Sequence, residues 1–130
     1  MLDEEKSEIL VVEDNKESQD VFRTSLEKRG YKVHLADDGE MCLKMLEELG
    51  SVVDVIIMDV FMPKMDGVTA CKIIKAKEET SHIPIIATSA GYEKKEDDEF
   101  DDFFAKPVDF DELCDLIETW GNIKFIDRDL

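Results

Sequence analysis

The feature that most constrains the fold is an unbroken apolar run, VIIM at residues 55–58, that ends in the carboxylate of Asp59. A strand buried on both faces of a parallel sheet has this pattern, because neither of its sides meets water. After Asp59 the pattern stops, and Pro63 and the turn pair Asp66-Gly67 precede a helical pattern. We therefore expect a central parallel strand that carries Asp59 to its carboxyl end, where ligands bind in open α/β sheets.

The rest of the chain alternates between short apolar runs and helical patterns. Further strands are expected at 9–12, 31–36, 85–88 and 103–105, and helices at 15–29, after Asp38, after Gly67 and after Asp109. Val21, Phe22 and Leu26 are expected on one side of the first helix, and Gly121 is expected to end the last one. This order predicts a parallel sheet with helices on both faces. We expect one domain over residues 1–130, with its core at about 7–120 and the tail 121–130 folded back onto it.

The stretch between the fourth and fifth strands departs from this order. Residues 93–102 are dominated by acids and hold one apolar residue, Phe100, which makes a poor amphipathic helix. We expect a shortened or irregular fourth helix there, mobile because its charges repel one another.

Composition narrows the partners and the location. The 33 Asp and Glu outnumber the 16 Lys and Arg, giving a net charge of -17, which argues against direct binding to nucleic acid or an anionic membrane. No apolar signal or membrane-length segment is found, so a cytoplasmic location is expected. Cys42, Cys71 and Cys114 are far apart in the sequence and are expected to be reduced packing residues.

Polar groups follow four of the expected strands. Glu13-Asp14 follow the first, Asp59 the third, Ser89 the fourth and Lys106 the fifth, and parallel strands bring these ends to one edge. Three carboxylates repel one another unless a hard cation such as Mg²⁺ joins them. A lysine and a hydroxyl suit the oxygens of a phosphoryl group, so Asp59 is a candidate nucleophile that forms an aspartyl phosphate.

Each of these residues also has a structural explanation when it is considered alone. Glu13-Asp14 could cap the first helix, Ser89 could cap a turn, and Lys106 could be an ordinary surface lysine. The functional interpretation depends on all four strand ends carrying such groups together.

The combined motifs resemble the receiver domain of two-component response regulators, over about residues 7–120. They are Glu13-Asp14, Asp59, Pro63, Asp66-Gly67, Ser89-Ala90 and Lys106-Pro107. The resemblance implies a doubly wound, flavodoxin-like sheet of five parallel strands in the order 2-1-3-4-5. It also implies phosphorelay signalling, in which a histidine kinase or histidine phosphotransfer protein phosphorylates the central aspartate and so switches binding to a downstream protein. Enzyme activity would be limited to Mg²⁺-dependent self-phosphorylation and autodephosphorylation.

By the same resemblance, Asp59 is the phospho-acceptor and belongs to the Mg²⁺ site. Asp14 would bind Mg²⁺ directly, Glu13 mainly through water, and the backbone carbonyl of Phe61 would complete the protein ligands. Because Phe61 is bulky and lies two residues after the acceptor, we expect it to influence the lifetime of the phosphorylated state.

The resemblance also implies a switch. Ser89 would hold a phosphoryl oxygen and move toward it, and Lys106, which precedes an expected cis peptide bond to Pro107, would pair with another oxygen. Phe103 takes the place of the family's switch aromatic and lacks the hydroxyl of the commoner Tyr. Only 16 residues separate Ser89 from Lys106, fewer than in a typical receiver, so output through the fourth helix is doubtful.

Three other functions share parts of this pattern. A haloacid-dehalogenase-like phosphatase would carry an acid where Phe61 stands, and a flavodoxin-like electron carrier would not place Glu13-Asp14 beside a phosphate. A receiver fold that acts only as a constitutive protein-binding module is the third alternative. The sequence leaves open the cognate kinase, the downstream protein, and whether this is a stand-alone protein or a fragment of a larger one.

Overall fold

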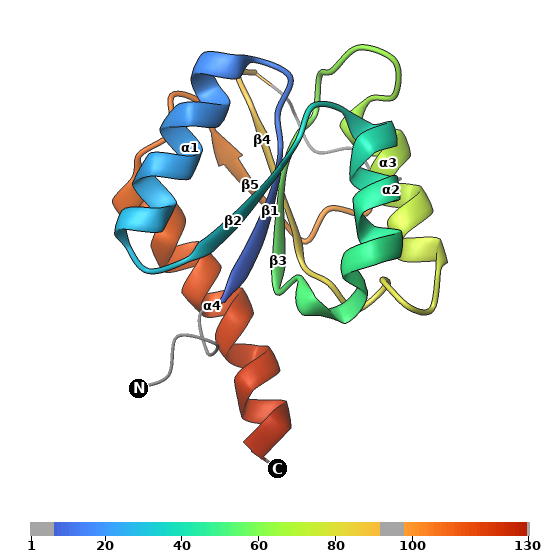
Figure 1. Cartoon of the computed structure of the whole chain (residues 1–130), viewed down its shortest axis with the longest axis vertical. Helices are drawn as coiled ribbons and strands as arrows, with labels where there is room; N and C mark the ends of the chain where they lie inside the picture. Colours follow the sequence, from blue (N-terminus) through green and yellow to red (C-terminus); the bar gives the residue numbers. More distant parts are fainter. Residues whose placement is uncertain (1–6, 92–97, 130) are drawn as a thin grey trace.

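The computed structural model describes residues 7–91 and 98–129 of the chain. Its five strands form one parallel sheet in the order β2-β1-β3-β4-β5, as predicted. In chain order the elements are β1 (Glu8–Val12), α1 (Lys16–Lys28), β2 (Lys32–Ala36), α2 (Gly39–Leu49), the 3-10 helix η2 (Gly50–Val52), β3 (Val55–Asp59), α3 (Gly67–Ala76), β4 (Ile85–Ser89), β5 (Asp102–Ala105) and α4 (Phe110–Asp129). The carboxyl ends of the strands lie at the top of Figure 1.

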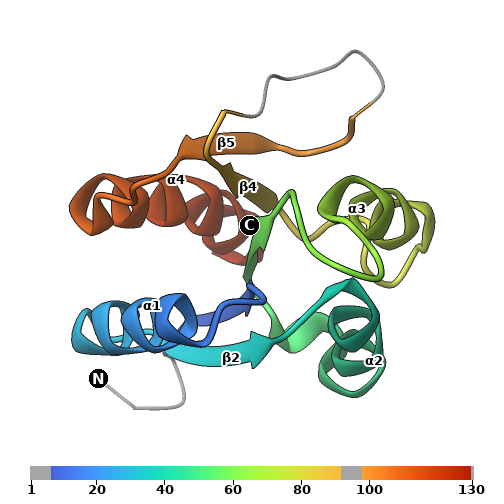
Figure 2. The same cartoon turned by 90° about the horizontal axis from the view of Figure 1, so that it is seen from above.

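The sheet is covered by two pairs of helices. Figure 2 shows α1 and α4 on one face, and α2 and α3 on the other. The central strand β3 pairs with both β1 and β4, and all five of its residues are buried. Its side chains alternate between the two faces: Ile56 and Met58 pack under α2 and α3, and Val55 and Ile57 under α1 and α4. The unbroken apolar run is therefore explained by burial on both sides.

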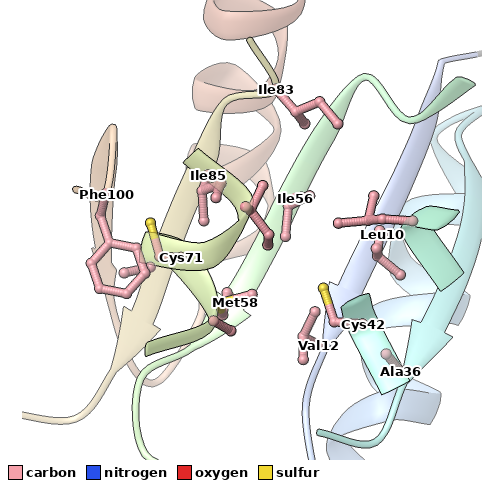
Figure 3. Packing of buried hydrophobic residues seen from close by; sticks show 14 of the residues in the cluster. Leu10, Val12, Ala36, Cys42, Ile56, Met58, Cys71, Ile83, Ile85 and Phe100 are labelled. Carbon is pink, nitrogen blue, oxygen red and sulfur yellow. The ribbon is translucent and has the colours of Figure 1, made fainter. Parts of the chain in front are cut away.

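Two of the three cysteines belong to the core under α2 and α3, whose side chains Figure 3 shows. Cys42 and Cys71 are buried free thiols, and burial raises the pKa of each to about 12. Cys114 is likewise free and lies in the core on the other face. The prediction that the cysteines are packing residues is confirmed.

Side-chain caps fix the starts of the four described α-helices. Asn15, Asp38 and Asp66 accept hydrogen bonds from the backbone N–H groups of Ser18, Met41 and Thr69, and Asp109 accepts one from Glu112. Such caps satisfy N–H groups that the helix itself leaves without a partner. The sequence therefore places the helix starts to within about a residue.

A short non-helical segment directly precedes β5. Residues 98–101 are not helical, and Phe100, only 4% exposed, packs in the core under α3. A carboxylate oxygen of Asp101 accepts a hydrogen bond from the N–H of Ile85 at 2.8 Å and pairs with Lys75 Nζ at 2.7 Å. In this described part, an anchored non-helical segment precedes β5, as expected from the prediction of a shortened or irregular helix between β4 and β5. The predicted mobility falls mainly on residues 92–97, which lie outside the described residues.

Two predictions for the C-terminal end are wrong. The helix α4 does not end at Gly121 but continues to Asp129, and Figure 1 shows its last turns extending away from the sheet instead of folding back. Glycine weakens a helix by only about 1 kcal/mol relative to alanine and does not end it unless its neighbours also leave the helical conformation. No helix in the described part of the chain combines the length and apolarity that a bilayer span requires.

Candidate functional site

Three carboxylates meet at the carboxyl edge of the sheet. Glu13 and Asp14 directly follow β1, and Asp59 is the last residue of the neighbouring strand β3, where Val12 lies opposite Met58. One oxygen from each of the three acids can be chosen so that all lie within 4.8 Å of one another. The structure thus brings together the acids that the sequence assigned to one site.

Lys106 joins this group from β5. Its Nζ lies 3.0 Å from Glu13 Oε1 and 3.2 Å from Asp59 Oδ2. Burial opposes the charged form of Lys106, but its hydrogen bond to Glu13 and the charge of Asp59 outweigh that effect, so the pKa of Lys106 is raised. In the described part of the chain, the site therefore combines three acids with the Lys106 ammonium group, which stays protonated at neutral pH.

Glu13 is held at several points. Its Oε2 accepts a hydrogen bond from the N–H of Asn15 at 3.0 Å, while its own N–H donates to the carbonyl of Ala36 at 3.0 Å. The side-chain amide of Gln19 donates to the Glu13 carbonyl at 2.6 Å. Glu13 is only 2% exposed, so its carboxylate has a fixed orientation.

Asp59 is held from the loop that follows it. Its Oδ1 lies 3.3 Å from the backbone N of Phe61, and the residue is 6% exposed. Gly67 packs so closely against the end of β3 that a Cβ there would clash with the backbone oxygen of Asp59. This contact explains the glycine of the Asp66-Gly67 pair, whose aspartate caps α3.

The remaining predicted residues lie on the neighbouring strands β4 and β5 and in the loop that follows β3. Ser89, the last residue of β4, is 7% exposed, and its hydroxyl lies 3.5 Å from the carbonyl of Ala90. Ser89 and Phe103 both line a cavity of about 410 Å³, and Phe103 stacks edge-to-face on Phe100 with ring centroids 5.8 Å apart. Phe61 is 62% exposed. The peptide bond between Lys106 and Pro107 is cis, as expected.

One buried residue beside the site was missed from the sequence. Gln19 lies on the inward face of α1 with Phe22 and Leu26, whereas Val21, which was expected on that face, is 52% exposed. The sequence did contain a signal for this position. Gln19 lies three positions before Phe22 and seven before Leu26, so the helical spacing places it on the same face of α1. Its hydrogen-bond partners lie outside the helix and could not be found from the helical pattern.

The fold and the acids define a class of protein: a doubly wound α/β domain with an acidic site at the carboxyl edge of its sheet. Residues 9–118 match the family described as the response regulator receiver domain. The chain belongs to this family of two-component signalling domains, as the sequence motifs indicated.

Its relatives include much longer signalling proteins. The chain is 36% identical over 121 residues to hybrid signal transduction histidine kinase I of Dictyostelium discoideum, covering 85% of this chain and 7% of that protein. It is 34% identical over 118 residues to the CAI-1 autoinducer sensor kinase/phosphatase CqsS of Vibrio cholerae, covering 86% and 17%. The chain therefore spans only a small part of these relatives.

Solved receiver structures agree with the fold. The receiver domain of sensor histidine kinase PA1611 from Pseudomonas aeruginosa, which holds a magnesium ion in its active-site cleft, is 33% identical, with a TM-score of 0.83 over 90% of this chain and 98% of that chain. The chemotaxis protein CheY4 of Vibrio cholerae is 23% identical, with a TM-score of 0.80 over 88% and 98% of the two chains, and supports the fold alone.

Proposed function

We propose that this chain accepts a phosphoryl group on Asp59 in a Mg²⁺-dependent reaction, and that the phosphorylated form changes its binding to a downstream protein. The donor is a histidine kinase or a histidine phosphotransfer protein. The observation that carries the proposal is the convergence of Glu13, Asp14, Asp59 and Lys106 at one edge of the sheet.

The donor set fits Mg²⁺. Among the residues that the structure describes, three carboxylates face the ammonium group of Lys106, which leaves an excess of negative charge that a hard divalent cation would relieve. Asp14, Asp59 and the backbone carbonyl of Phe61 would hold the ion directly, and Glu13 mainly through water. When bound, the ion neutralises the carboxylates and the oxygens of an incoming phosphoryl group. The magnesium-bound PA1611 receiver supports this assignment.

The chemistry requires one bond to form and one to break. A carboxylate oxygen of Asp59 forms a bond to phosphorus, and the phosphorus–nitrogen bond of the donor phosphohistidine breaks. The electron pair of that bond stays on the imidazole nitrogen, which takes a proton from solvent. Lys106 then exchanges its contact with Asp59 for a phosphoryl oxygen, and the Ser89 hydroxyl donates to another.

The buried acids favour this function over that of a constitutive binding module. Glu13 and Asp59 are 2% and 6% exposed, and burying charges is costly unless they are paired. A module without site chemistry would not need three acids at this point. The switch role of Phe103, the extent of the domain over residues 1–130, the absence of a nucleic-acid partner and the cytoplasmic location stay predictions from the sequence.

The experiment is intact-mass analysis after incubation with acetyl phosphate, with and without Mg²⁺. We expect one added phosphoryl group on the wild type only when Mg²⁺ is present, and none on Asp59→Asn. Addition to Asp59→Asn, or addition without Mg²⁺, would contradict the assigned acceptor or the assigned ion. No addition together with no Mg²⁺ binding would favour the constitutive binding module.

A further inference from the structure

Gln19 is a buried polar residue that is tied to the acidic site. It is 5% exposed, and its Nε2 lies 2.6 Å from the carbonyl oxygen of Glu13 and 2.7 Å from Asp37 Oδ1. The carbonyl and the ionised carboxylate can only accept hydrogen bonds, and an amide NH₂ has two hydrogens to donate. Both hydrogens are therefore used, and the opposite orientation of the amide would place its oxygen against two acceptors.

These two hydrogen bonds join the chain segments that follow β1 and β2. Glu13 follows β1 and Asp37 follows β2, and α1 begins just beyond Glu13, at the edge of the sheet seen at the top of Figure 1. The carboxylate of Glu13 is held by Asn15 and Lys106, whereas its carbonyl is held by Gln19. Gln19 thus fixes the backbone from which Glu13 and the next residue, Asp14, extend.

We infer that Gln19 is a positioning residue for the Mg²⁺ site, an inference that rests on the proposed function. The two hydrogen bonds of the Gln19 amide go to the Glu13 carbonyl and to Asp37 rather than to the carboxylates of the site, so Gln19 acts by fixing the peptide unit between Glu13 and Asp14. Without its amide, the carbonyl of Glu13 loses a donor in a buried place and the loop shifts to find another. Residues that orient metal ligands in this way typically contribute about 10- to 100-fold to metal affinity.

The test is the Mg²⁺ affinity of Gln19→Met, measured by titration calorimetry on the full chain. Methionine has a similar length and volume but no hydrogen-bond donor. We expect Mg²⁺ to bind at least about tenfold more weakly than to the wild type. A second measurement uses the metal-free protein: hydrogen exchange of the Asn15 amide, which donates to Glu13 Oε2, should be faster in the variant.

Lys16→Met is the matched control. Lys16 lies in the same turn of α1, and its Nζ pairs with the same Asp37 oxygen at 2.9 Å, but it has no hydrogen bond to Glu13. Its loss removes a positive charge near the acids, so the Mg²⁺ affinity should be unchanged or slightly higher. A folded Gln19→Met protein with wild-type affinity, or an equal weakening in Lys16→Met, would overturn the inference.

Gln19→Asn is available if Gln19→Met does not fold. It keeps the amide but is one methylene shorter, so it cannot reach both acceptors, and wild-type Mg²⁺ affinity in this variant would also overturn the inference. The two proposals fail differently. If the wild type itself binds no Mg²⁺, the proposed function fails as well; if the wild type binds Mg²⁺ and is phosphorylated while the Gln19 variants behave identically, only the positioning role fails.

Discussion

At the scale of single residues, Lys106 balances the charge of the site. Its ammonium group lies within 3.2 Å of two carboxylates and is 28% exposed. A cation bound at the site would compete with the Lys106 ammonium group, because both would be attracted by the negative charges of Glu13 and Asp59. We therefore expect Lys106 to stabilise the metal-free protein and to weaken the proposed binding of Mg²⁺.

Lys106→Met tests this balance. In the absence of Mg²⁺ the variant should lose about 1–3 kcal/mol of unfolding free energy, because two largely buried carboxylates are left without their cation. Its Mg²⁺ affinity should rise about tenfold. Thermal unfolding across a Mg²⁺ titration measures both effects, and an equal stabilisation of wild type and variant by Mg²⁺ would contradict the competition.

We predict that Phe61 influences how water reaches Asp59, the proposed phospho-acceptor. Its backbone N–H contacts Asp59 Oδ1, and its side chain is 62% exposed beside the site. We expect Phe61→Asn to speed dephosphorylation by up to about tenfold, or about 1.4 kcal/mol in the barrier, because a polar side chain can bind and orient water. The decay of the phosphorylated mass peak gives the rate. Phe61→Leu is the control, and it should keep the wild-type dephosphorylation rate because its side chain is also apolar. An unchanged dephosphorylation rate in Phe61→Asn would contradict the predicted role of Phe61.

At the scale of elements, the segment at 98–101 shows what the local pattern cannot reveal. Strands, helix starts and the acid-bearing strand ends follow from periodicity, caps and turns, and they were predicted. The anchoring of Phe100 depends on residues far away in sequence, since Phe100 packs with the core under α3 and stacks on Phe103. The contacts of Gln19 and the continuation of α4 past Gly121 were missed because neighbouring residues do not determine them.

Phe100→Ala tests the anchoring of this segment. Because Phe100 is 4% exposed, its truncation should cost about 3–5 kcal/mol of unfolding free energy. Phe61→Ala is the matched control, since it makes the same chemical change at a side chain that is 62% exposed, and it should change stability by less than about 0.5 kcal/mol. Denaturant unfolding compares them, and a similar small effect in both variants would show that Phe100 does not anchor the segment.

At the scale of the whole molecule, the net charge of -17 opposes compactness everywhere, while the carboxylate site concentrates the repulsion at one edge of the sheet. Any salt screens the general repulsion, because the Debye length falls from about 30 Å at 0.01 M to about 10 Å at 0.1 M. The local repulsion that Lys106 leaves uncompensated is relieved further by a cation that fits the three acids. The two contributions can therefore be separated by comparing salts at equal ionic strength.

We expect the melting temperature to rise with NaCl. It should rise further with MgCl₂ at the same ionic strength, because the proposed Mg²⁺ site exists only in the folded protein. Asp14→Asn should keep the NaCl effect and lose most of the additional MgCl₂ effect, since Asp14 is exposed and belongs to the cluster but not to the Lys106 ion pairs. Differential scanning calorimetry gives both quantities. If Asp14→Asn retained the full additional MgCl₂ effect, Mg²⁺ would be stabilising the protein through its overall charge rather than through this site.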